Sequence, residues 1–85
     1  MLSCCRAAQP GPARVAYAIG RRTGNAVERN RIRRRLRHIV HDHAERLLPD
    51  HQYLVGATPA ALRTPTRELQ DAWLQLVDRV HGELR

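Results

Sequence analysis

Two long segments of the chain carry apolar residues at the spacing of an amphipathic helix. The first begins near Asn25 and reaches Leu48, and the second begins near Thr64. In both, apolar residues recur three or four positions apart, so at about 100° per residue they share one face. The predicted stripes are Ile32, Leu36, Ile39, Val40, Ala44, Leu47 and Leu48 in the first helix and Leu69, Ala72, Trp73, Leu76, Val77, Val80 and Leu84 in the second.

Both predicted helices have residues that are typical of helix ends. Asn25 is placed to cap the first helix, and Glu28 follows three positions later, where its carboxylate can bond back to the cap. Pro49 is predicted to end this helix. Thr64 is predicted to cap the second helix, with Pro65 at the first helical position, where no backbone donor is needed.

Three shorter segments have the pattern of β-strands, with a proline-rich turn cluster at residues 9–12 between the first two. These segments are Leu2–Ala8, Arg14–Ile19 and Gln52–Ala57, the last being a short apolar run typical of a buried strand. The predicted order is therefore β-β-α-β-α. It indicates a single domain over residues 1–85 of the α/β (α+β) class, with a small mixed sheet of about three strands and two helices packed on one face.

The second strand has two unlike faces. Val15, Tyr17 and Ile19 alternate with Ala16 and Ala18. This alternation predicts a bulky side turned to the core and a smooth side of small residues.

Charge is concentrated in the first helix and the residues before it. The chain has a net charge of +7, and all fifteen of its basic residues are arginine. This exclusive use of arginine is typical of a GC-rich coding bias. At helical spacing, Arg31 and Arg34 lie opposite the apolar stripe, Arg35 lies nearer to them than to the stripe, and Arg33 and Arg37 flank it. A helix that is buried on one side and cationic on the other is expected to bind a polyanion.

A solvated surface is the simplest alternative for such a charge run. Against it, Arg33, Arg34 and Arg35 are consecutive and repel one another, and Glu28 is the one acid nearby. An anionic partner would relieve this repulsion.

Other features limit the classes of protein to consider. No apolar run approaches the roughly 20 residues that a membrane span needs, so no membrane partner is expected. Cys4 and Cys5 are adjacent and indicate a reduced, cytoplasmic protein. The carboxylates are not spaced to converge as a two-metal nuclease requires. His38, His41 and His43 are interpreted as partly exposed side chains that add positive charge near the helix C-terminus rather than as zinc ligands. Trp73 is interpreted as a core residue.

The spacing of the basic segment is more specific than its charge. Residues 21–34 read RRTGNAVERNRIRR. This string resembles the signature of the bacterial ribonuclease P protein subunit. Residues 53–60, YLVGATPA, are similar to that family's next strand. The amphipathic segment from Arg67 onward is similar to the family's closing helix. The resemblance implies a ribonuclease P protein-like, ribosomal protein S5 domain 2-like fold, with a left-handed crossover around the first helix.

The resemblance also implies a function. The chain would be the protein subunit of a ribonucleoprotein endonuclease that removes the 5′ leader of precursor tRNA and leaves a 5′-phosphate. The RNA subunit and its Mg²⁺ ions would perform the chemistry, so no catalytic protein residue and no direct metal ligand are expected. The implied partners are the ribonuclease P RNA subunit and precursor tRNA.

Residue roles carry over from the same signature. Family members contact RNA through positions that correspond here to Arg21, Arg22, Asn25, Arg29, Asn30, Arg31, Arg33, Arg34 and Arg37, with Asn30 expected near RNA-bound Mg²⁺. Ala16, Ala18 and Gly20 are expected to line the cleft that holds the leader.

Relative to the family, we expect a basic and aromatic segment, a helix and most of a first strand before Leu2 to be lacking, either because the start codon was assigned too late or because this form is truncated. Leader binding would then be the function most affected. The main alternative is a non-catalytic RNA-binding protein, either ribosomal-protein-like or a degenerate paralogue. A helix-turn-helix DNA reader is disfavoured, because a strand separates the two predicted helices.

Overall fold

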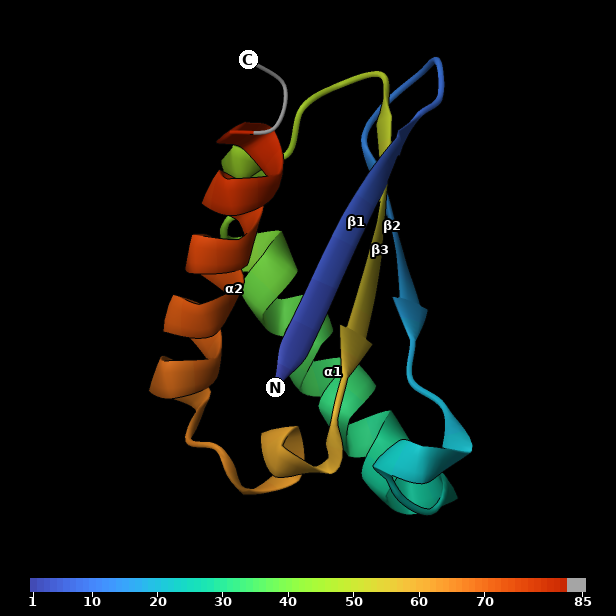
Figure 1. Ribbon diagram of the computed structural model, residues 1–85, viewed down its shortest axis with the longest axis vertical. Helices are drawn as coiled ribbons and strands as arrows, with labels where there is room; N and C mark the ends of the chain where they lie inside the picture. Colours follow the sequence, from blue (N-terminus) through green and yellow to red (C-terminus); the bar gives the residue numbers. More distant parts are fainter. Residues whose placement is uncertain (83–85) are drawn as a thin grey trace.

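The computed structural model describes residues 1–82, which form three strands and two long helices. The strands are β1 (Leu2–Ala8), β2 (Arg14–Ala18) and β3 (His51–Ala57), and the helices are α1 (Ala26–Asp42) and α2 (Thr66–Gly82) (Figure 1). Short 3₁₀ turns lie between them: η1 (Arg21–Thr23), η2 (Ala44–Arg46) and η3 (Pro59–Arg63). The predicted β-β-α-β-α order and the α/β class are confirmed.

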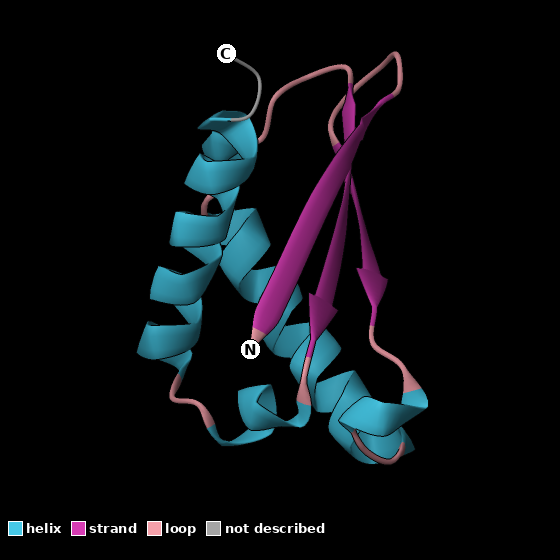
Figure 2. Ribbon diagram, viewed as in Figure 1, coloured by secondary structure: helices cyan, strands magenta, loops and turns pink. Residues whose placement is uncertain are grey.

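The last strand in the sequence lies in the middle of the sheet. The strand order is β1-β3-β2, with β3 antiparallel to β1 and parallel to β2 (Figure 2). Val55 of β3 aligns with Cys4 of β1 and Tyr17 of β2. Because alternate residues of a strand share a face, these side chains point to the same side of the sheet, and all three belong to or pack against the core.

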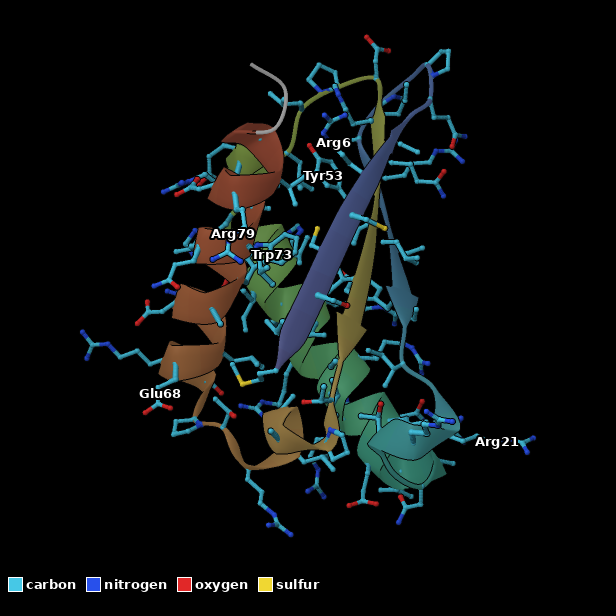
Figure 3. The ribbon with its side chains drawn as sticks, viewed as in Figure 1. Arg6, Arg21, Tyr53, Glu68, Trp73 and Arg79 are labelled. Atoms are coloured by element: carbon cyan, nitrogen blue, oxygen red, sulfur yellow. The ribbon has the colours of Figure 1, made fainter. Side chains whose placement is uncertain are left out.

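The core lies between this face of the sheet and the two helices. Its largest fully buried side chains are Trp73, Tyr53, Ile32, Leu36, Leu69, Val55 and Val77. Both predicted stripes therefore supply core residues, and the interpretation of Trp73 as a core residue is confirmed (Figure 3). Leu84 of the second predicted stripe lies outside the described residues.

The prediction that α1 reaches Leu48 is wrong. The helix ends at Asp42, and His43 leaves the helical conformation with φ −122° and ψ 34°. The next residues form η2, so Ala44 and Leu48 are exposed and Leu47 alone continues to pack on the core. Beyond the helix end, Arg46 Nη1 of η2 bonds Asp78 Oδ1 of α2 at 2.9 Å, and this exposed pair accompanies the turn.

The start of α2 also differs from the prediction. The helix begins at Thr66, and the Leu69 N–H donates to the Pro65 carbonyl at 3.0 Å. Thr64 is therefore not the cap. Its hydroxyl donates to the Ala60 carbonyl at 2.8 Å, within the preceding turn.

The central strand is buried on one face alone. Tyr53 and Val55 are fully buried, whereas Leu54 between them is 44% exposed. The prediction of a wholly buried strand is thus wrong for Leu54, because both helices cover the same side of the sheet.

The two adjacent cysteines should react at different rates. Burial, and then the neighbouring Cys5 thiolate, raise the pKa of Cys4 from 9.0 to about 11. A roughly hundredfold smaller thiolate fraction at mildly alkaline pH follows from this shift, whereas Cys5 is exposed. Mass spectrometry after brief iodoacetamide treatment at pH 8 should find the label mainly on Cys5. Equal labelling would show that Cys4 is not protected.

Candidate nucleic-acid interface

A capping box fixes the N-terminus of α1. The Glu28 N–H donates to Asn25 Oδ1 at 2.8 Å, and the Asn25 N–H donates to Glu28 Oε1 at 3.0 Å, as predicted. Gly24 precedes the cap with φ 156°, and a Cβ there would lie 2.9 Å from Glu28 Oε1. Glycine is needed at this position for both reasons. Asn25 was predicted to contact RNA, and its amide oxygen is held by the cap.

A buried threonine anchors the turn that carries the first two arginines. Thr23 Oγ1 donates to the carbonyl of Ala57 at the end of β3, at 2.9 Å. This bond holds η1 against the sheet and leaves Arg21 and Arg22 exposed. Figure 3 shows Arg21 pointing away from the body of the protein.

The arginine face of α1 consists of Arg29, Asn30, Arg31, Arg33, Arg34 and Arg37. Arg31, Arg34 and Arg37 are exposed, and Arg29 and Arg33 are half-buried beside the apolar stripe. Within residues 1–82, ion pairs join His43 to Glu45 and Arg46 to Asp78. The positive charge of the arginine face is therefore not neutralised by carboxylates in this part of the chain.

Two neighbours orient parts of the arginine face. Arg33 Nη1 donates to Asn30 Oδ1 at 2.9 Å. The guanidinium carbon of Arg37 lies 5.9 Å from the centre of the Tyr17 ring on β2, within the range of a cation–π contact. Arg29 Nε is buried with no hydrogen-bond partner among the described residues. These contacts position the charged groups while leaving donors free for a ligand.

Arg35 has a structural role instead. Its guanidinium donates to the carbonyl oxygens of Ala61 (2.9 Å) and Thr64, and it lies 3.4 Å from Thr66 Oγ1. The side chain therefore binds the carbonyls at the end of η3, a role that the sequence did not predict. The predicted repulsion among the three consecutive arginines is partly relieved within the chain, because the carbonyls and Asn30 solvate two of the three charges.

Replacing Arg35 by alanine should destabilise the fold. The variant leaves the Ala61 and Thr64 carbonyls without their donor, and we expect a loss of about 1–3 kcal/mol in the free energy of unfolding. Arg35→Lys should not restore it, because a compact ammonium does not match the planar fork of arginine. Urea denaturation measures the free energy of unfolding of the wild-type protein and of both Arg35 variants. Arg34→Ala is the matched control, and equal loss in both variants would contradict the assignment.

A hollow of about 580 Å³ joins η1, α1 and η3. Arg22 and Arg31 line it together with Arg63 of η3. Arg63 was missed from the sequence, because an isolated arginine in a turn has no periodicity that relates it to α1. The structure thus extends the positive surface beyond the predicted residues.

The predicted cleft residues separate into two groups. Ala16 and Ala18 align with Leu54 and Gly56 of β3, on the sheet face turned away from the helices. A hollow of about 210 Å³ on this face is lined by Ser3, Cys4, Cys5, Ala18, Leu54 and Gly56. Of the three predicted cleft residues, Ala18 lines this hollow, whereas Ala16 and Gly20 do not. Gly20 lies beyond the end of β2, at the start of η1.

The described residues contain no group of three or more histidine, cysteine, aspartate or glutamate side chains that could hold a metal ion. Asn30 lies on the arginine face, and its side-chain amide oxygen, Oδ1, already accepts a hydrogen bond from Arg33. His38 and His41 are exposed, as predicted. No helix of the described part of the chain is long and apolar enough to cross a membrane.

Comparisons with known proteins agree on one family. The family model described as Ribonuclease P matches residues 1–81. A Ribonuclease P protein component from Nocardioides sp. is 41% identical over 73 residues, which cover 86% of this chain and 62% of that protein. One from Acidothermus cellulolyticus is 40% identical over 72 residues, covering 85% of this chain and 59% of that protein. The chain thus spans less than two thirds of the length of these curated relatives.

Solved structures support the fold. The RNase P protein from Thermotoga maritima superposes with a TM-score of 0.82 at 17% identity, covering 92% of this chain and 76% of that one. The Staphylococcus aureus RNase P protein superposes with a TM-score of 0.72 at 23% identity, covering 91% and 70%.

Proposed function

The chain belongs to the ribonuclease P protein family, and we propose that it binds the catalytic RNA subunit and the 5′ leader of precursor tRNA. In this role it supports the endonucleolytic 5′ maturation of tRNA. The observation that carries the proposal is the arginine face of α1, which is built on the family-like signature of residues 21–34. Arg31, Arg34 and Arg37 are exposed along this helix. The helix is capped at its start and packs on the sheet.

The arginine face suits the phosphates of folded RNA. Guanidinium groups can donate two parallel hydrogen bonds to a phosphate. Each neutralised phosphate releases condensed counterions, which favours binding. Arg33 is held by Asn30, so less side-chain freedom is lost when it binds. Asn30 keeps its amide N–H donors available for a phosphate or for water near the RNA.

The chemistry in this proposal belongs to the RNA subunit. The Mg²⁺ ions held by the RNA would catalyse phosphodiester hydrolysis and leave a 5′-phosphate on the tRNA. The side chains of the described residues do not fit a Mg²⁺ site of their own, because Asn30 is one oxygen donor and its oxygen is already used. The contribution of the protein is to neutralise phosphates and to position the RNA.

The smooth sheet face is the proposed place for the leader. Ala16 and Ala18 have short side chains, so the outer surface of β2 has no large protrusions. Gly56 lies beside them, and a Cβ there would lie 2.6 Å from Ser3 Oγ and would displace that side chain. An extended strand of RNA could approach such a surface closely.

Reconstitution tests this function. The purified protein alone should not cleave precursor tRNA at any Mg²⁺ concentration, and addition of the protein to the RNA subunit should lower the Mg²⁺ concentration needed for cleavage. Specific cleavage by the RNA-free protein, or an unchanged Mg²⁺ requirement, would contradict the proposal. Sequencing of the RNA that co-purifies with the protein separates this function from that of a ribosomal-protein-like binder.

A further inference from the structure

A groove of about 550 Å³ lies between the C-terminal half of α1 and strand β2. Its apolar lining comes from Tyr17, Val40 and Leu47, which belong to three separate parts of the chain. Leu47 reaches the groove because α1 ends at Asp42 and the chain turns back through η2. The groove is therefore a product of the helix end that the sequence did not predict.

The rim of the same groove is cationic and rich in donors. Arg34, Arg37, His38 and His41 line it, and none of them has a carboxylate partner within residues 1–82. Arg37 lies over the Tyr17 ring, at 5.9 Å from its centre. Aromatic surface and unneutralised positive charge thus meet at one place.

Tyr17 has the exposure that a stacking surface needs. Its ring packs against the core and is half-buried, with part of it open to the groove. Burial raises the pKa of its hydroxyl above the ordinary value of 10.0, although the Arg37 charge opposes this rise. Because the pKa is raised, the side chain is neutral at physiological pH. Stacking on such a ring is tolerant of base identity, because every base has a π-face.

We propose that this groove holds one unstacked nucleotide of bound RNA, with its base against Tyr17, Val40 and Leu47 and its phosphate toward Arg34 and His38. A phosphate alone would use the rim and leave the apolar lining in contact with water. An apolar peptide would cover the lining and leave the rim charges without partners. A nucleotide matches both, and the groove has the size of ordinary small-molecule sites.

The inference rests on the proposed function in that the ligand is RNA. It adds recognition of a base to the phosphate contacts of the arginine face. It also assigns Tyr17, Leu47 and His38 to the interface, none of which was predicted from the signature.

The test uses two single-stranded octanucleotides of equal charge, octa-adenylate and the same oligomer with its bases replaced by abasic spacers. The wild-type protein should bind octa-adenylate on the order of tenfold more tightly than the abasic oligomer. Tyr17→Leu keeps an apolar side chain and removes the ring, and this variant should lose that preference. Tyr17→Phe should retain it. Thermal unfolding of both variants establishes that they are folded.

Two results would overturn the inference: equal affinity of the wild-type protein for the two oligomers, or an undiminished preference in folded Tyr17→Leu. A separate filter-binding measurement with ribonuclease P RNA keeps the two proposals distinct. Failure to bind that RNA would count against the proposed function, whereas tight RNA binding without a preference for bases would count against the nucleotide groove alone.

Discussion

Leu36→Ala should lower the free energy of unfolding by about 2–5 kcal/mol, because it removes a fully buried side chain and leaves a cavity. Leu36 lies on the apolar face of α1, in the same core cluster as Trp73 of α2 and Val55 of β3. A domain of this size is stabilised by about 5–15 kcal/mol in total at most. The substitution should therefore remove a large part of the total stability and move the urea midpoint to a clearly lower concentration.

Urea denaturation followed by circular dichroism measures this loss. Val27→Ala is the matched control, because Val27 lies on the same helix and its side chain is 69% exposed. The control should change stability by roughly 0.5 kcal/mol or less. Similar midpoints for Leu36→Ala and Val27→Ala would show that the core is not packed as described.

The double variant Arg31→Ala/Arg34→Ala should bind ribonuclease P RNA much more weakly while remaining folded. Both side chains are exposed on the arginine face. We expect each lost phosphate contact to weaken binding on the order of tenfold. Each should also reduce the slope of log affinity against log salt by about 0.7–0.9. The slope of the double variant should thus fall by about 1.4–1.8.

A second double variant separates local contact from net charge. Arg67→Ala/Arg79→Ala removes the same charge from exposed positions of α2. It should alter the salt slope far less, since these positions lie outside the arginine face. If the two double variants lose affinity and slope equally, the arginine face acts through overall charge and makes no direct contacts.

The parts of the fold that follow from local chemistry were predictable. The capping box at Asn25 and Glu28 depends on residues three positions apart. The apolar stripe of α1 depends on apolar residues that recur every three or four positions. The helix end was not predictable, because the apolar spacing continues through Leu47 and Leu48 although the chain has left the helix. The Arg46–Asp78 ion pair that accompanies this turn spans 32 positions of sequence, which no local pattern can indicate.

The candidate site divides in the same way. The exposure of Arg31 and Arg34 follows from helical spacing alone. The role of Arg35 depends on where the η3 carbonyls lie, and the contact between Arg37 and Tyr17 depends on how α1 packs on β2. Arg63 joins the positive surface through tertiary structure as well. Residue type and period therefore predict which side chains carry charge, whereas packing decides which of them remain available to a ligand.

The sheet order has a consequence for how the protein is made. β1 and β2 are neighbours in sequence, yet each pairs with β3 and they do not pair with each other. None of the strand pairs seen in the structure can therefore form until residues 51–57 have left the ribosome. By that time the whole of α1 has been synthesised. Until then α1 lacks the sheet that buries its apolar stripe, and the contacts that stabilise it close long loops. Assembly of the sheet is thus a late event, and the support for the arginine face is complete only after β3 has been made.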